Sequence, residues 1–214
     1  MITIINKNNE QISFKTDLPL SLANAIRRSA NYIPILAVDS LEISKNDSAL
    51  YDEIIAHRVG LVPLKNENLK LPAECGCGKE EGCSKCSMKL KLSEKGPGII
   101  YSDQMSPGEN IIHKIPITIL DKDQELEFVA IAKRGKGIEH AKFSPGLIYY
   151  KYENDGVEGN DEEFKKLLED VKKEKEENLI MTIESWGQIS PKEIFISSTE
   201  MLNEEIKNLL KKIK

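Results

Sequence analysis

The sequence lacks long apolar runs and an excess of positive charge, and it has no cysteine outside one short segment. No apolar run approaches the roughly 18 residues that a membrane-spanning helix needs. The 214 residues carry a net charge of -5, which argues against a dedicated nucleic-acid binder. The first seven residues show no basic region leading into a long apolar segment, so no signal peptide is predicted. We therefore expect a cytoplasmic protein with no membrane partner.

Cysteine is scarce, and all 4 copies lie close together in the chain, as Cys75, Cys77, Cys83 and Cys86. Cytoplasmic thiols stay reduced, so this cluster indicates a metal rather than disulfides. Four cysteine ligands complete the tetrahedral shell of a structural zinc ion and leave no open position for catalysis. Two alternatives stay open: unliganded or redox-active cysteines, and an iron–sulfur cluster, although the bacterial and plant-type cluster spacings do not fit.

Signatures of catalysis are also missing. None of the three histidines, His57, His113 and His140, lies beside a serine or cysteine in a nucleophile-elbow context. The basic, glycine-containing segment 134–142 could hold a phosphate on backbone N–H groups, but the full phosphate-loop motif is absent. A basic loop for protein contact is the favoured interpretation of that segment. We predict no catalytic residue.

Helix and strand signals are dense near the N-terminus. We expect strands at residues 2–5 and 36–43 on either side of a helix at residues 20–31. Asp17 is the expected cap of this helix, and Pro19 suits its first turn. One face of the helix repeats at the helical period and comprises Leu22, Ile26, Ser29, Ala30 and Ile33.

The middle of the chain has the texture of short strands and turns. Met88, Leu90 and Leu92 alternate with lysines, which predicts a half-buried strand. Segments 111–120 and 125–132 are separated by a short polar connection, which predicts a β-hairpin.

The C-terminal part begins with a charged segment, residues 161–178, that we interpret as a solvated surface helix. A strand follows at residues 179–183. Ser190 and Glu193 form a predicted capping box with Pro191 at the first helical position, which starts a helix running to the last residue. Its apolar seam fits another helix, either in this chain or in a partner, and consists of Phe195, Leu202, Ile206, Leu209 and Ile213.

Five blocks spread along the chain carry a resemblance to a known family. They are LANAIRR at 22–28, ILAVD at 35–39, DEIIAHRVGLVP at 52–63, AKRGKGIEHAK at 132–142 and IESWG at 183–187. Together they resemble the alpha-like subunits of DNA-directed RNA polymerase, represented by the D subunit of the archaeal enzyme, by the third-largest subunit of eukaryotic RNA polymerase II and by the bacterial alpha subunit. The likeness covers nearly the whole chain in order.

This resemblance implies an α+β fold of the RNA polymerase alpha-subunit type. A discontinuous dimerisation domain, residues 1–45 and 174–214, would enclose an inserted β-rich domain, residues 46–173, with a metal loop at 75–86. The implied function is a non-catalytic assembly subunit of DNA-directed RNA polymerase, whose magnesium chemistry would reside in the largest subunits. Its implied partners are subunit L in a heterodimer, the second-largest subunit, and the small subunits N and P, with DNA contacted only through the assembled polymerase.

The resemblance also assigns residues. Subunit L would contact Leu22, Ile26, Arg27, Arg28, Ile33, Phe195, Leu202, Ile206, Leu209 and Ile213. Possible contacts to a large subunit are Arg134, Lys136, His140 and Lys142. The cysteine loop resembles the zinc loop of the eukaryotic counterpart. Some archaeal members instead carry an iron–sulfur cluster in an inserted ferredoxin-like domain, which is excluded here because no cysteine follows Cys86.

Two functions from other classes compete with this one. A stand-alone zinc-knuckle module for nucleic acid would need a basic face, against which the net charge of -5 speaks. A small metal hydrolase would need an open coordination position and a general base, neither of which is recognisable in the sequence.

Overall fold

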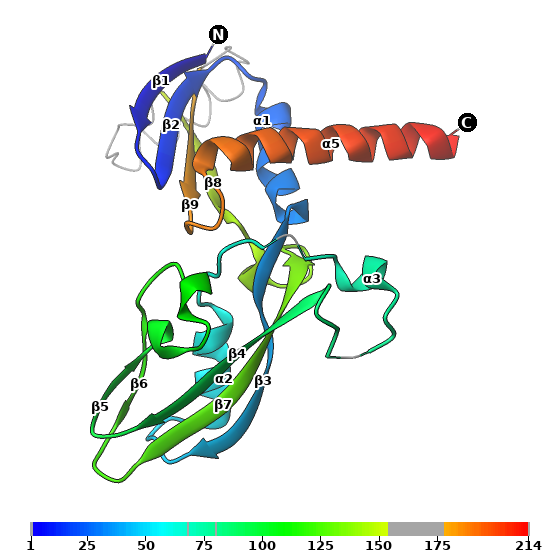
Figure 1. Ribbon diagram of the computed structural model, residues 1–214. Coiled ribbons are helices and arrows are strands. Elements are labelled where there is room, and N and C mark those ends of the chain that lie inside the picture. Colours follow the sequence, from blue (N-terminus) through cyan, green and yellow to red (C-terminus); the bar gives the residue numbers. More distant parts are fainter. Residues whose placement is uncertain (1, 68, 80, 154–177, 214) are drawn as a thin grey trace. The chain divides into compact units, whose positions relative to one another are not determined.

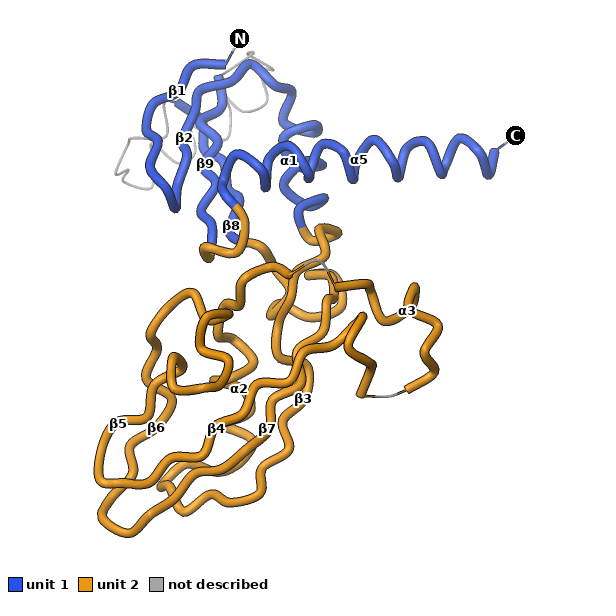
Figure 2. The backbone as a smooth tube through the Cα atoms, in the orientation of Figure 1, with its two compact units in different colours: residues 1–30, 146–185, 190–214 blue, residues 31–145, 186–189 orange. Residues whose placement is uncertain are grey.

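The computed structural model describes residues 2–67, 69–79, 81–153 and 178–213 (Figure 1). The chain divides into two compact units, each assembled from separate segments (Figure 2). Unit 1 takes residues 1–30, 146–185 and 190–214, and unit 2 takes residues 31–145 and 186–189. Within the described residues, no helix is both long and apolar enough to cross a membrane.

Unit 1 is built on a four-stranded antiparallel sheet with the order β1-β2-β9-β8. The strands are β1 (Ile2–Lys7), β2 (Gln11–Thr16), β8 (Gly146–Tyr152) and β9 (Leu179–Ser185). Two helices, α1 (Leu20–Ser29) and α5 (Pro191–Ile213), pack against each other and against this sheet. Side chains alternate along β9, so Met181 and Ile183 are buried on the core side.

The start of α5 forms the predicted capping box. Glu193 N donates to Ser190 Oγ at 3.3 Å, while Ser190 N donates to the Glu193 carboxylate at 3.0 Å. The pKa of Glu193 is accordingly lowered by its hydrogen bonds to Ser190. Pro191 occupies the first helical position, where its missing N–H costs nothing.

Unit 2 contains a three-stranded antiparallel sheet with the order β3-β7-β4 and a separate two-stranded ribbon, β5-β6. The strands are β3 (Pro34–Asn46), β4 (Ser87–Lys95), β5 (Gly98–Tyr101), β6 (Pro116–Leu120) and β7 (Glu125–Lys136). The helices are α2 (Asp52–Gly60), which packs on β3 and β6, and the single turn α3 (Pro72–Cys75). The core between these elements is lined by Leu36, Val38, Ile55, Val59, Leu64, Leu90, Leu92, Leu120, Leu126 and Phe128.

Three sequence-based expectations need correction or stay outside the structure. The predicted hairpin between segments 111–120 and 125–132 is wrong, because β7 pairs with β3 and β4 while β6 pairs with β5. Asp17 does not cap α1: Pro19 is the N-cap residue, and no side chain caps the helix. The charged helix predicted at 161–178 lies outside the described residues, apart from Asn178.

The compact units divide the chain at different places from the predicted domains. Residues 31–45 fall in unit 2, because β3 is paired along its length with β7. Residues 146–152 fall in unit 1, because β8 pairs with β9. The assignment of residues 1–45 and 174–214 to dimerisation stays a prediction about function.

Candidate functional site

The four cysteines converge in unit 2. Their sulfur atoms all lie within 4.8 Å of one another. The Sγ–Sγ distances are 3.5 Å between Cys75 and Cys83, 3.8 Å between Cys77 and Cys86, and 3.8 Å between Cys83 and Cys86. A tetrahedron with zinc–sulfur bonds of about 2.3 Å has edges of about 3.8 Å. Three of the six sulfur–sulfur distances therefore lie close to the edge length of such a tetrahedron, and the remaining ones stay within 4.8 Å.

Local backbone structure brings the thiols into this arrangement. Cys75 ends α3, and Gly76 then turns the chain in a left-handed conformation with φ of 63°. On the other side, Cys83 N donates to Cys86 Sγ at 3.2 Å, and Cys86 N donates to the Cys83 carbonyl at 2.9 Å. Gly82 has φ of 80°, and a Cβ there would lie 2.8 Å from the Ser87 Cβ. A larger residue cannot replace Gly82 without displacing this turn.

The thiols influence one another's ionisation. Hydrogen bonds with Cys86 and Cys83 raise the pKa of Cys75 to about 12. The backbone N–H of Lys85, with the hydrogen bond from Cys75, lowers the pKa of Cys83 to about 7. One sulfur thus carries negative charge readily while a neighbour keeps its proton, because the Lys85 N–H and the Cys75 thiol stabilise the Cys83 thiolate by hydrogen bonds. A bound cation would instead hold all four sulfurs as thiolates.

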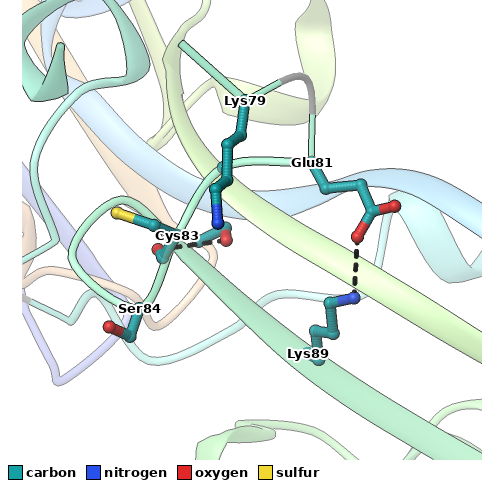
Figure 3. A pocket seen from close by; sticks show the side chains of 7 residues that line it. Lys79, Glu81, Cys83, Ser84 and Lys89 are labelled. Atoms are coloured by element: carbon teal, nitrogen blue, oxygen red, sulfur yellow. Dashed lines mark hydrogen bonds and ion pairs between the residues drawn. The ribbon is translucent and has the colours of Figure 1, made fainter. Parts of the chain in front are cut away.

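A pocket of about 710 Å³ lies beside the cysteine loop (Figure 3). Glu81 and Lys89 form an ion pair of 2.8 Å across part of it, and this pair lowers the pKa of Glu81. The complete lining is Lys79, Glu81, Gly82, Cys83, Ser84, Ser87 and Lys89. We assign no ligand to this pocket.

The side chains expected to contact subunit L fall into two groups. In α1, Ile26 is buried in the core of unit 1, while Leu22 is exposed. Arg27 and Arg28 are exposed as well. The Arg27 guanidinium donates to Asn24 Oδ1, on the same helix, at 2.9 Å. Ile33 follows α1 in the chain and is buried in unit 2.

Helix α5 changes character along its length. Its first half is packed within unit 1: Ile194 is fully buried, and the Phe195 ring meets Phe14 edge-on at 5.3 Å. Leu202 is half-buried. The second half projects past α1 (Figure 1) and exposes 49% of Ile206, 62% of Leu209, 56% of Leu210 and 74% of Ile213. Leu210 was not predicted, although it follows Ile206 by four residues and so shares its face.

Two of the four side chains expected to meet a large subunit, Arg134 and Lys142, are hydrogen-bonded within unit 2. Lys142 Nζ donates to the Asp39 carbonyl and carboxylate, both at 3.1 Å, and Lys133 Nζ donates to the same carboxylate at 3.2 Å. Arg134 donates to two backbone carbonyls, those of Leu69 and Pro34. His140 remains exposed, and its Nδ1 accepts from Lys142 N at 3.1 Å.

Glycines in the same segment make room for close packing. A Cβ on Gly135 would lie 2.6 Å from the Phe143 ring, and a Cβ on Gly137 would lie 2.7 Å from Asn31 Oδ1. Lys136 is half-buried on the same strand. The pattern of glycines and basic residues therefore folds the segment back on β3 and β7. Sequence reasoning missed the acceptor, Asp39, because nothing local marks it as the partner of lysines about a hundred residues away.

A family model and the curated relatives of this chain all point to subunits of DNA-directed RNA polymerase. The model of the family described as "RNA polymerase Rpb3/RpoA insert domain" matches residues 34–148. DNA-directed RNA polymerase subunit Rpo3 of Methanothermobacter thermautotrophicus is 40% identical over 156 residues, which cover 68% of this chain and 58% of that protein. DNA-directed RNA polymerase II subunit rpb3 of Dictyostelium discoideum is 35% identical, covering 66% of this chain and 53% of that protein.

Coverage differs among these relatives. DNA-directed RNA polymerase II subunit RPB3 of Schizosaccharomyces pombe is 30% identical over 259 residues, which cover 98% of this chain and 86% of that protein. The matches to the archaeal Rpo3 proteins of Methanothermobacter and Pyrococcus horikoshii span only 58% and 59% of those proteins.

Proposed function

This chain belongs to the family of RNA polymerase subunits that contain the Rpb3/RpoA insert domain, and we propose that it is a non-catalytic assembly subunit of DNA-directed RNA polymerase. In this role it forms a heterodimer with a small alpha-like subunit, L. The dimer then serves as the platform for the second-largest subunit and the small subunits N and P. DNA is contacted only through the assembled enzyme, and we assign no catalytic residue to this chain.

The second half of α5 is the observation that supports the heterodimer most strongly. Its exposed residues Ile206, Leu209, Leu210 and Ile213 repeat at intervals of three and four, so they line one face of the helix. Such a face gains free energy when a second helix covers it, at about 25 cal/mol per Å² of apolar surface before the costs of association. Leu22 adds a further exposed apolar side chain on α1.

Co-expression with an L-like subunit tests the assembly proposal. We expect the two chains to co-purify as a complex of equal stoichiometry, measured by size-exclusion chromatography with light scattering. Expressed alone, the chain should be monomeric only in dilute solution and should self-associate as its concentration rises, because the apolar face of α5 is left uncovered. Failure of the two chains to co-purify would contradict the proposal.

We further propose that the four cysteines hold one structural zinc ion. The sulfur distances of 3.5 to 3.8 Å fit a tetrahedral ion, and Cys75, Cys77, Cys83 and Cys86 would together supply four thiolate ligands. The ion would cross-link two turns of the loop. Metal analysis of the purified complex should find about one zinc per chain, and a content far below that would contradict a four-cysteine site.

The stand-alone nucleic-acid-binding module is not favoured by the family match. A filter-binding assay separates the two functions. A salt-sensitive affinity of the isolated chain for nucleic acid would support the module, and its absence would leave assembly as the better account.

A further inference from the structure

Arg134 connects three segments of unit 2 at the edge of the cysteine loop. It lies on β7, two residues before the strand ends. Its Nη1 donates to the Leu69 carbonyl at 3.1 Å, and its Nη2 donates to the Pro34 carbonyl at 3.0 Å. Pro34 begins β3, and Leu69 begins the arm that leads through α3 to the first cysteine pair. A single guanidinium thus joins β7, β3 and this arm.

The Arg134 guanidinium is partly buried, so its hydrogen bonds within the chain matter for stability. Desolvation by burial lowers the pKa of Arg134, and the charge of Glu74 on α3 opposes that effect. Its Nε is buried and has no hydrogen-bond partner among the described residues. Burying a cation is costly, so its remaining donors need the two carbonyls, and the Leu69 carbonyl is available only while the arm stays in place.

The two sides of the cysteine loop are held in different ways. Cys86 leads directly into β4, where Ser87 pairs with Lys133, the neighbour of Arg134 on β7. The first cysteine pair has no strand of its own. Its arm is attached through Lys70 N, which donates to the Lys85 carbonyl at 2.9 Å, and through the contact of Arg134 with Leu69.

We propose that Arg134 is a positioning residue for the metal centre, whose guanidinium holds the arm of residues 69–75 so that Cys75 and Cys77 meet Cys83 and Cys86. This role rests on the zinc site proposed above. The possible contact of Arg134 with a large subunit stays a separate prediction. A lysine cannot fill the role fully, because its donors share one nitrogen, whereas the Leu69 and Pro34 carbonyls are reached by two different nitrogens of the Arg134 guanidinium.

Metal retention by the full chain in complex with its L-like partner tests this role. The variants are Arg134→Lys and Arg134→Ala, with Lys136→Ala as a matched loss of a cation two residues further along β7. Loss of an outer-shell support typically lowers metal affinity roughly 10-fold to 100-fold. We expect Arg134→Ala to show a loss of this size in chelator competition, Arg134→Lys a smaller loss, and Lys136→Ala none. Cobalt substitution should show a weakened thiolate charge-transfer band in the Arg134 variants.

Amide hydrogen exchange of the metal-loaded complex supplies a second readout. Exchange in residues 69–75 should accelerate in Arg134→Ala, while exchange in β4 should stay at the wild-type rate. If Arg134→Ala fails to fold, the same two measurements on the Arg134→Lys variant test the role of Arg134.

The contrary outcomes separate the two proposals. A wild-type chain that retains zinc, together with Arg134→Lys and Arg134→Ala variants that retain it equally well, would overturn the role of Arg134 and leave the zinc site standing. A wild-type chain that binds no metal would contradict the zinc site, and the role of Arg134 would fall with it.

Discussion

The second half of α5 and the basic segment 134–142 carry the two sets of side chains expected to meet partners, and their environments in the structure differ. On α5, apolar side chains such as Leu209 and Ile213 lie exposed along one face. In segment 134–142, Lys142 pairs with Asp39, and Arg134 donates to the carbonyls of Leu69 and Pro34. Charge pattern alone therefore does not identify a docking surface.

The difference has a physical cause. A lysine or arginine carries several donors on a long stem, so it can satisfy carbonyls and carboxylates of its own chain wherever the fold brings them near. An apolar side chain is satisfied only by burial, and α1 and the sheet of unit 1 cover only the first half of α5. The exposed helix face, more than the basic segment, is where we expect a partner.

The largest predicted effect concerns the exposed face of α5. Leu209→Asp should weaken the complex with the L-like subunit by about 2–4 kcal/mol, because a buried anchor would be replaced by a charge. The free energy of unfolding of the free chain should change by no more than about 0.5 kcal/mol, because the Leu209 side chain is already mostly exposed there. Calorimetric titration and urea denaturation measure the two effects.

The matched control is Asn208→Asp, which adds the same charge one residue away on the opposite side of the helix. It should leave the affinity within about 0.5 kcal/mol of the wild type. Equal weakening by both variants would show that added charge, and not the apolar face, governs binding.

A smaller effect is expected inside the basic segment. In Gly135→Ala the new Cβ would lie 2.6 Å from the Phe143 ring, so the ring must move. We expect a loss of about 1–3 kcal/mol in the free energy of unfolding, as for other overpacked sites. Trp186 is the sole tryptophan and lies in unit 2, so its fluorescence can follow urea unfolding of that unit.

Gly60→Ala is the control for this substitution, since the nearest atom to its Cβ is the Val38 carbonyl oxygen at 3.9 Å. It should be tolerated. If Gly135→Ala unfolds at the wild-type urea concentration, the packing of Phe143 on β7 does not stabilise unit 2.

The smallest effect is a pH dependence carried by Asp39. Burial alone would raise the pKa of Asp39, but hydrogen bonds and charges of Lys142 and Lys133 outweigh it and hold the pKa below its ordinary 3.8. The stabilisation is therefore complete above pH 3.8 and is lost as the pH falls through the lower, folded-state pKa. Asp39→Asn should cost about 1–2 kcal/mol near neutral pH, a value reduced by the partial exposure of Asp39.

The difference between wild type and Asp39→Asn should narrow in strong acid, measured by urea unfolding across the pH range. Glu125→Gln removes more exposed ion pairs at the other end of β7 and should have the weaker effect of the two. A difference for Asp39→Asn that stays constant down to the lowest pH would show that its carboxylate charge contributes nothing.

Local signals in the sequence predicted much of the fold. The capping box at Ser190 and the alternation of Met88, Leu90 and Leu92 depend on neighbouring residues, and both are confirmed. The failed hairpin shows the limit. The short connection before β7 suits a hairpin, but strand pairing is decided by burial across the sheet, and β7 is buried between β3 and β4.

Among the candidate sites, too, features set by neighbouring residues were predictable and features set by distant residues were not. The convergence of four cysteines was predictable because they are close in sequence and share a chemical preference. The inward direction of Arg134 was not, because its acceptors on Leu69 and Pro34 are backbone carbonyls that any residue type could supply. The exposure of α5 follows from where its packing partners end, which only the folded chain reveals.

Hydrogen exchange of α5 with and without the L-like subunit shows whether the second half of this helix is the partner-binding face. In the free chain, amides from residue 203 onward should exchange much faster than those between residues 194 and 200, whose side chains include buried ones. Binding should protect the second half of α5 strongly and leave exchange in segment 134–142 unchanged. Protection of segment 134–142 with no change along α5 would instead place the L-like subunit on the basic segment.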